Sequence, residues 1–229
     1  MVAWLLLLGG LLSAPIAPAE TSTAPAGLDR VLRGAQSGVT LEAFKGSHPD
    51  AVQEPPQEAP PSDASTGQIQ TAALVEKFSN DPLLGLECLA NYGFKNDLLT
   101  EWVVLWGGSQ EDVTRQRRAF FEACVWKYGP HFRRDVMQVN PHTENPPLVP
   151  ALFWEQEKVV YLASLAWNPE SQRAPGTFTF AMYPKGDAFL DQMLLADDLA
   201  PEVVRDAFAE LDLVLNDLTG LGGVAVPGR

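Results

Sequence analysis

Two of the three histidines in the chain stand near carboxylates, in a pattern that could hold a metal ion. His131, Asp135, His142 and Glu144 fall within 14 positions, and two imidazoles with two carboxylates are an acceptable ligand set for zinc. No H-E-x-x-H pair accompanies them, and ordinary loop histidines explain the same residues. We therefore expect no metal site, and we keep these four residues as the site that a secreted, metal-dependent hydrolase would use.

Other catalytic patterns are missing from the sequence. Ser109 follows two glycines but lacks the G-x-S-x-G turn that activates a nucleophilic serine, and it is better explained as a helix cap. The adjacent acids Asp197 and Asp198 precede a predicted helix, whose N-terminus favours negative charge. Neither a Walker loop nor a dinucleotide fingerprint is present. We expect no cofactor, and the sequence favours a protein that is not an enzyme.

Cys88 and Cys124 are the only cysteines, and they are 36 positions apart. In an exported protein they would form one disulfide, which chain-entropy arithmetic values at roughly 3–4 kcal/mol. The alternative is two reduced thiols buried as small apolar groups. Because no C-x-x-C pair is present, a redox active site is not expected.

The net charge of -13 argues against a protein that binds nucleic acid, because such proteins present a basic surface to phosphates. One stretch of the chain is nevertheless basic. It contains Arg115, Arg117, Arg118, Lys127, Arg133 and Arg134. These residues either pair with nearby acids or form a basic spot for an acidic polymer or an anionic membrane face.

Trp126 is the aromatic residue that best fits an exposed binding platform. It lies off the apolar stripe of its predicted helix, close in angle to Arg118 and Glu122. The predicted binding surface consists of Trp126, Arg115, Arg118, Arg133 and Arg134.

The first residues of the chain predict export. Residues 1–19 contain no charged side chain, Trp4 to Leu12 is nearly all apolar, and Ala17 and Ala19 occupy the positions that a signal peptidase reads. Cleavage near Ala19 would release a periplasmic or extracellular protein. If the segment stays attached, the protein is a membrane-anchored assembly component facing outside the cytoplasm, and this segment is its only expected membrane contact.

Residues 20–67 are rich in proline and alanine, which predicts a disordered linker. The alternative is a short segment that folds against the domain or a partner. It rests on a cluster of apolar residues: Leu28, Val31, Leu32, Val39, Leu41 and Phe44.

Residues 68–218 form the predicted globular domain, followed by a flexible tail at 219–229. Apolar spacing predicts helices over residues 72–78, 81–93, 98–106 and 109–129. Strands are expected at 132–139, 151–154, 158–167 and 177–183, and further helices at 187–195 and 201–218. Helices, then an antiparallel sheet of three or four strands, then two C-terminal helices define an α+β fold.

The sequence therefore predicts an exported binding or assembly module of the cell envelope without catalytic activity. Its expected partner is a protein or an envelope polymer, and the sequence leaves the oligomeric state open.

Overall fold

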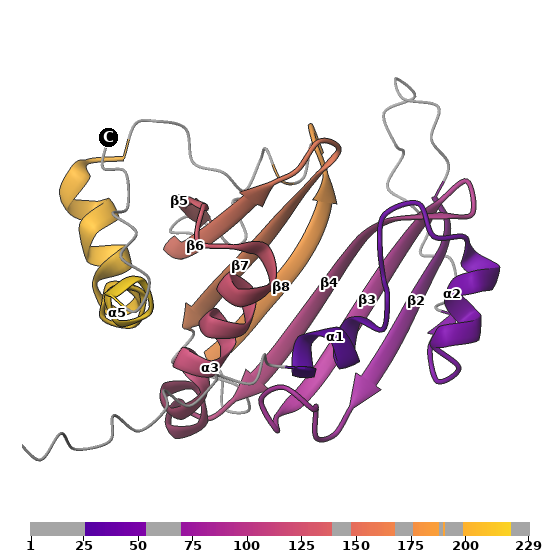
Figure 1. Cartoon of the computed structure of the whole chain (residues 1–229), viewed down its shortest axis with the longest axis horizontal. Coiled ribbons are helices and arrows are strands. Elements are labelled where there is room, and N and C mark those ends of the chain that lie inside the picture. The colour runs from indigo at the N-terminus through magenta and orange to yellow at the C-terminus, as the bar shows by residue number, and fades with distance from the viewer. Residues whose placement is uncertain are drawn as a thin grey trace, which may run out of the picture.

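The protein is described by a computed structural model, which covers residues 26–53, 70–138, 148–167, 176–187, 190 and 199–220. Its centre is one antiparallel sheet of eight strands in the order β1-β2-β3-β4-β8-β7-β6-β5 (Figure 1). The strands are β1 (Val52–Gln53), β2 (Gln70–Phe78), β3 (Glu87–Lys95), β4 (Leu98–Gly108), β5 (Arg133–Gln138), β6 (Leu148–Glu155), β7 (Val159–Trp167) and β8 (Gly176–Pro184). The helices are α1 (Ala26–Leu32), α2 (Leu41–Ser47), α3 (Gln110–Tyr128) and α5 (Pro201–Gly220).

The sheet consists of two meanders that meet in its middle. Strands β2, β3 and β4 form the first meander, and β5 to β8 form the second. The join is the pairing of β4 with β8, in which Trp102 lies opposite Met182. Helix α3 connects the two meanders and lies across the sheet.

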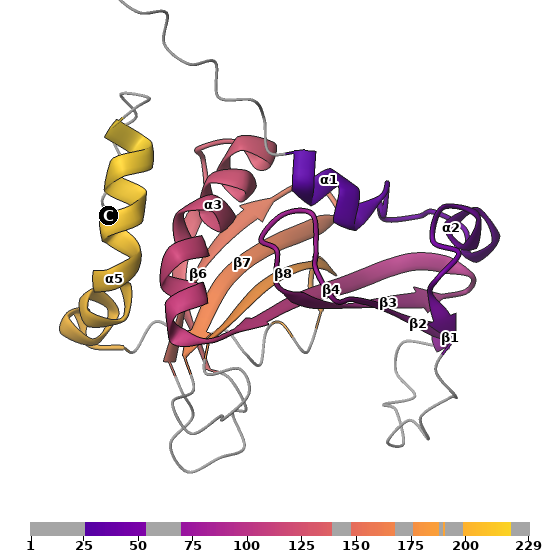
Figure 2. The same ribbon diagram turned by 90° about the horizontal axis from the view of Figure 1, so that it is seen from below.

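The four helices lie on one face of the sheet (Figure 2). The main core lies between this face and the helices, and its largest fully buried side chains include Trp102, Trp106, Phe120, Phe178 and Phe180. The opposite face of β5 to β8 carries a smaller apolar cluster around Phe153 and Leu162. The core therefore holds α1, α3 and α5 against the same side of the sheet.

The predicted fold class is wrong, because the sheet has eight strands and the first three predicted helices are strands. Residues 72–78 belong to β2, and residues 98–106 belong to β4. Trp102, Val104 and Trp106 alternate toward the core, whereas Val103 and Leu105 lie half-buried between them. Because both faces of β4 are apolar, its residues also matched a helical spacing.

The predicted second helix, over residues 81–93, is a turn followed by β3. Buried Asp81 accepts backbone hydrogen bonds from Leu83, Leu84 and Leu86, at 2.7, 3.0 and 3.0 Å. An Asp before a proline can begin a helix in this way. Here Gly85, with φ of +68°, ends the turn, and the chain continues as a strand.

Other predicted elements are confirmed. Helix α3 begins after Ser109, whose side chain accepts a hydrogen bond from the amide of Asp112, and it ends at Gly129. Strands β5 to β8 and helix α5 lie close to their predicted positions. The helix expected at 187–195 lies outside the described residues, apart from positions 187 and 190.

The linker expectation is wrong for residues 26–53. We call this segment the N-terminal strap, and it contains α1, α2 and the short strand β1. Four apolar residues of the strap are buried in the main core: Leu28, Val31, Leu32 and Phe44. The strap therefore folds against the domain, as the alternative interpretation of this segment predicted. The leader at 1–19, the rest of the linker at 20–25 and 54–67, and residues 221–229 of the predicted tail lie outside the described residues.

Among the described residues, no helix is long and apolar enough to cross a membrane.

Candidate functional site

The structure tests half of the predicted metal ligands. His131 is exposed, and Asp135 forms an ion pair with Arg133. His142 and Glu144 lie outside the described residues. Within the described ranges, no group of three or more His, Cys, Asp or Glu side chains is arranged to hold a metal ion.

The predicted disulfide is not formed in the structure. Cys124 lies on helix α3 as predicted, whereas Cys88 lies on strand β3 instead of the helix predicted over residues 81–93. Both side chains are buried free thiols in the main core. Burial raises the pKa of each thiol, so both stay protonated and unreactive at neutral pH.

The predicted aromatic and basic surface is only partly assembled. Trp126 is 54% exposed on α3. Arg115 and Arg118 are exposed on the same side of that helix, where Arg115 pairs with Asp112. Ion pairs within the protein therefore balance most of the positive charge of this surface. On β5, Arg133 pairs with Asp135 and Glu155, and Arg134 pairs with Asp212.

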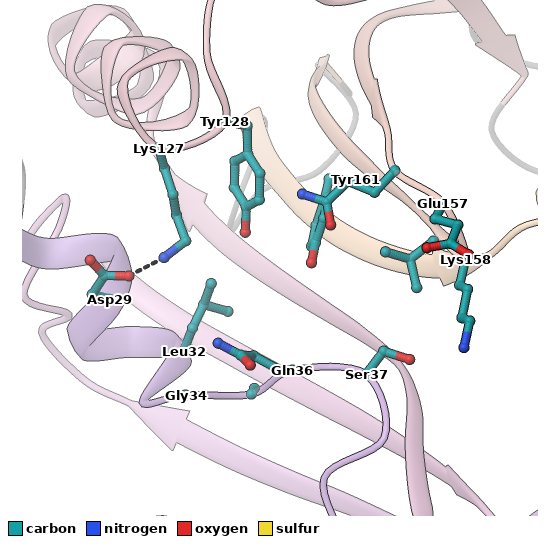
Figure 3. A pocket seen from close by; sticks show the side chains of 13 residues that line it. Asp29, Leu32, Gly34, Gln36, Ser37, Lys127, Tyr128, Glu157, Lys158 and Tyr161 are labelled. Carbon is teal, nitrogen blue, oxygen red and sulfur yellow. Dashed lines mark hydrogen bonds and ion pairs between the residues drawn. The ribbon is translucent and has the colours of Figure 1, made fainter.

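A pocket that no sequence pattern indicated lies between the strap, the end of α3 and the β6–β7 hairpin (Figure 3). Its volume is about 750 Å³, within the range of small-molecule sites. It is lined by Asp29, Leu32, Gly34, Ala35, Gln36, Ser37, Lys127, Tyr128, Gln156, Glu157, Lys158, Val159 and Tyr161. We call it the tyrosine pocket.

Two tyrosines form one wall of the tyrosine pocket. The rings of Tyr128 and Tyr161 are 4.3 Å apart between centroids, and Tyr161 stacks on Phe180 behind it. Figure 3 shows both hydroxyl groups pointing toward the side of the pocket that Leu32 and Gln36 form. Burial raises the pKa of both tyrosines, so their hydroxyl groups stay protonated and can donate hydrogen bonds.

The charged groups of the tyrosine pocket are balanced. Asp29 and Lys127 form an ion pair between α1 and α3, which closes one side of the pocket (Figure 3). Glu157 and Lys158 stand on the β6–β7 turn at the other side, and both are exposed. The lining therefore carries two positive and two negative side chains, with no net formal charge.

Hydrogen bonds to the backbone of the strap hold the strap wall of the pocket in place. The indole Nε1 of Trp102 donates a hydrogen bond to the carbonyl of Ala35 at 3.1 Å. The amide of Gly38 donates to the carbonyl of Leu99, and the amide of Leu99 donates to the carbonyl of Val39, both at 2.8 Å. These bonds attach residues 35–39 to the start of β4, so the strap wall has a defined position over the sheet.

A buried polar cluster lies under the strap, next to this wall. Arg33 at the end of α1 forms an ion pair with Glu76 of β2. His48 stacks on Phe44 with ring centroids 3.8 Å apart and lies 5.3 Å from the ring of Tyr92. Within the described part of the chain, Arg33 Nε, His48 Nε2, Glu76 Oε2 and Tyr92 OH lack hydrogen-bond partners. These atoms are buried, so the cluster depends on the strap staying in place.

Sequence reasoning missed the tyrosine pocket because its walls come from three distant stretches, 29–37, 127–128 and 156–161. Tyr128 falls in the predicted helix over residues 109–129 and Tyr161 in the predicted strand at 158–167, and neither position by itself indicates a site. The one signal that pointed to the strap wall was the apolar cluster from Leu28 to Phe44.

Comparison of the chain with known protein families, curated proteins and solved structures gives no match.

Proposed function

We propose that the protein is an exported, non-catalytic binding module whose ligand occupies the tyrosine pocket. The observation that carries the proposal is the pocket itself, a cavity of about 750 Å³ whose lining comes from three separate segments of the chain. Concave sites with a few convergent polar groups are where proteins usually bind ligands.

The chemistry of the lining supports binding rather than catalysis. The described lining residues include no histidine or cysteine, and the carboxylate of Asp29 is engaged by Lys127. General acid–base catalysis needs a group that titrates near the working pH. The two tyrosines do not meet this need, because burial raises their pKa. Their protonated hydroxyl groups are suited to holding a ligand.

Export and an envelope partner remain part of the proposal, and the uncharged, apolar leader at residues 1–19 supports them. A binding module outside the cytoplasm would meet either a protein or an envelope polymer. The tyrosine pocket gives such a partner a defined point of attachment on the helix-bearing side of the sheet.

The proposal is tested by screening small polar fragments against the mature protein and mapping the hits by NMR. We expect hits that shift the amide signals of residues 34–37, 127–128 and 156–161. Tyr161→Ala removes one of the two rings that form the tyrosine wall and is expected to abolish these hits. Trp126→Ala is the control, because Trp126 is exposed outside the pocket. Hits that bypass the pocket, or hits that Tyr161→Ala leaves unchanged, would contradict the proposal.

A further inference from the structure

We propose that the ligand of the tyrosine pocket is an uncharged saccharide, a unit of a hydroxyl-rich polymer. This inference rests on the proposed function and names the class of ligand. It follows from the charge balance of the lining, the kind of hydrogen-bonding groups that face the cavity, and the position of the pocket in the sheet.

The charge balance favours an uncharged ligand. The chain as a whole carries a net charge of -13, whereas the lining carries none, because Lys127 and Lys158 balance Asp29 and Glu157. Lys127 is already paired with Asp29. An anionic ligand would have to compete for that lysine and would approach a strongly acidic protein, which slows association. A cationic ligand would face the same competition for Asp29.

The hydrogen-bonding groups favour a ligand with many hydroxyls. Tyr128, Tyr161, Gln36, Gln156 and Ser37 offer neutral hydroxyl and amide groups, each able both to donate and to accept. A sugar hydroxyl also donates and accepts, so it matches groups of this kind. The aliphatic lining side chains contribute little exposed surface, since Leu32 is 3% exposed and Val159 is 6% exposed. The cavity therefore presents mainly polar atoms to its ligand.

The position of the pocket argues against an extended peptide. Peptides that bind along a sheet add a strand to a free edge. The strand that lines the pocket is β7, which pairs with β6 on one side and β8 on the other. An anchoring pocket for apolar side chains would need exposed aliphatic surface, and the lining has little. Neither of these features of peptide recognition is found at the described lining residues.

Binding is tested by isothermal calorimetry on the mature protein with three probes: tetra-N-acetylchitotetraose and cellotetraose, which are uncharged, and trigalacturonate, which is anionic. We expect measurable binding of at least one uncharged probe and at least tenfold weaker binding of the anionic one. An unstructured peptide of alternating Gly and Ser serves as the peptide probe and is expected not to bind. A preference for the anionic or peptide probe, or no binding by either uncharged probe, overturns the saccharide assignment.

Matched hydroxyl deletions locate the binding. Tyr161→Phe removes one hydroxyl from the pocket and is expected to weaken saccharide binding by about tenfold, the cost of one hydrogen bond. Tyr92→Phe removes a buried hydroxyl outside the lining and is expected to leave binding unchanged. Equal effects of the two variants overturn the assignment. If fragments bind the pocket but no uncharged saccharide does, only the ligand class fails; if nothing binds there, the proposed function fails with it.

Discussion

Arg33 and Glu76 form an ion pair between the end of α1 and the buried face of β2, across 43 positions of sequence. The Glu76 side chain is 1% exposed and the Arg33 side chain 28%. A buried ion pair loses much of its Coulombic gain to desolvation, so it defines a position more than it adds stability. This pair therefore fixes where the N-terminal strap lies on the sheet, and with it the strap wall of the tyrosine pocket.

Removing one partner of this pair is expected to destabilise the protein more than removing both. Arg33→Met leaves the buried Glu76 carboxylate unpaired and is expected to lower the free energy of unfolding by about 3 kcal/mol. The double variant Arg33→Met/Glu76→Leu is expected to recover most of that loss, because no buried charge remains. Urea denaturation measures both. A double variant that is less stable than Arg33→Met would contradict this account.

The strap is expected to loosen as the pH falls below about 6.5, the ordinary pKa of histidine. Burial lowers the pKa of His48, and the nearby Arg33 lowers it further, so the folded protein keeps His48 neutral while the released strap binds a proton. This contribution to stability is complete above pH 6.5 and is lost as the pH falls through the lowered pKa. The protection factors of the amides of residues 26–53, which correct for the intrinsic pH dependence of hydrogen exchange, measure this loss between pH 7.5 and 5.5.

Glu76 contributes to the same pH dependence with the opposite sign. Burial raises its pKa despite the Arg33 charge, so its protonation favours the folded state at low pH. The other groups that act on the cluster are Asp50, Asp81, Cys88 and Tyr92. His48→Gln removes the titrating imidazole, and it should reduce the difference in amide protection of the strap between pH 7.5 and 5.5. An unchanged difference in that variant would assign the effect to another group.

Gly27 is expected to tolerate no side chain. A Cβ at this position would lie 2.6 Å from the Cα of Leu83 and 2.9 Å from the carbonyl oxygen of Pro82. Both are backbone atoms, so the clash can be relieved only by moving the main chain. Gly27→Ala should therefore displace α1 and speed hydrogen exchange in the strap. Gly46→Ala is the matched control in α2, where the added methyl meets nothing within 4 Å and should leave stability equal or up to about 1 kcal/mol higher. Similar losses in both variants would contradict the packing described for Gly27.

Cys88 and Cys124 are expected to resist thiol reagents in the native protein. Both are buried, and burial raises the pKa of each, so little thiolate is present. A disulfide exchange reagent should label neither at pH 8 within minutes and both after denaturation. Absence of reaction in the denatured, unreduced protein would show that the purified protein contains the disulfide after all.

Cleavage of the leader is expected near Ala19. Mass spectrometry of the protein recovered from the envelope fraction should find a mature N-terminus at Glu20. An intact Met1 terminus would instead support the membrane-anchored alternative.

Sequence reasoning predicted the second half of the sheet better than the first, and β4 shows why. In β7 and β8 the strand pattern was recognised from β-branched and aromatic residues between clear turns. In β4, apolar residues such as Val103 and Leu105 also occupy the face away from the helices, so no alternation was visible and a helical spacing fitted equally well. The pairing of β4 with β8, which makes one sheet of two meanders, leaves no local signal at all.

The tyrosine pocket was beyond prediction for a related reason. Its strap wall comes from a stretch whose average composition suggested disorder, although Leu28, Val31 and Phe44 bury enough apolar surface to hold it. Tyr128 and Tyr161 are 33 positions apart in the chain, and only the packing of α3 over β7 brings their rings together. Neither residue type nor spacing distinguishes such a pair from ordinary core aromatics.

The join between β4 and β8 also bears on how the chain folds. During synthesis the β2-β3-β4 meander is complete long before β8 has been made. The edge of β4 therefore stays unpaired until Met182 can lie opposite Trp102. Contacts that join such distant parts of a chain form slowly, because the intervening loop must close first. For the exported protein proposed above, a slow final step would leave the newly made polypeptide extended for longer, the state in which a secretion channel can pass it. The same open edge is the place where incompletely folded chains would associate, so aggregation is expected to compete with folding at this step.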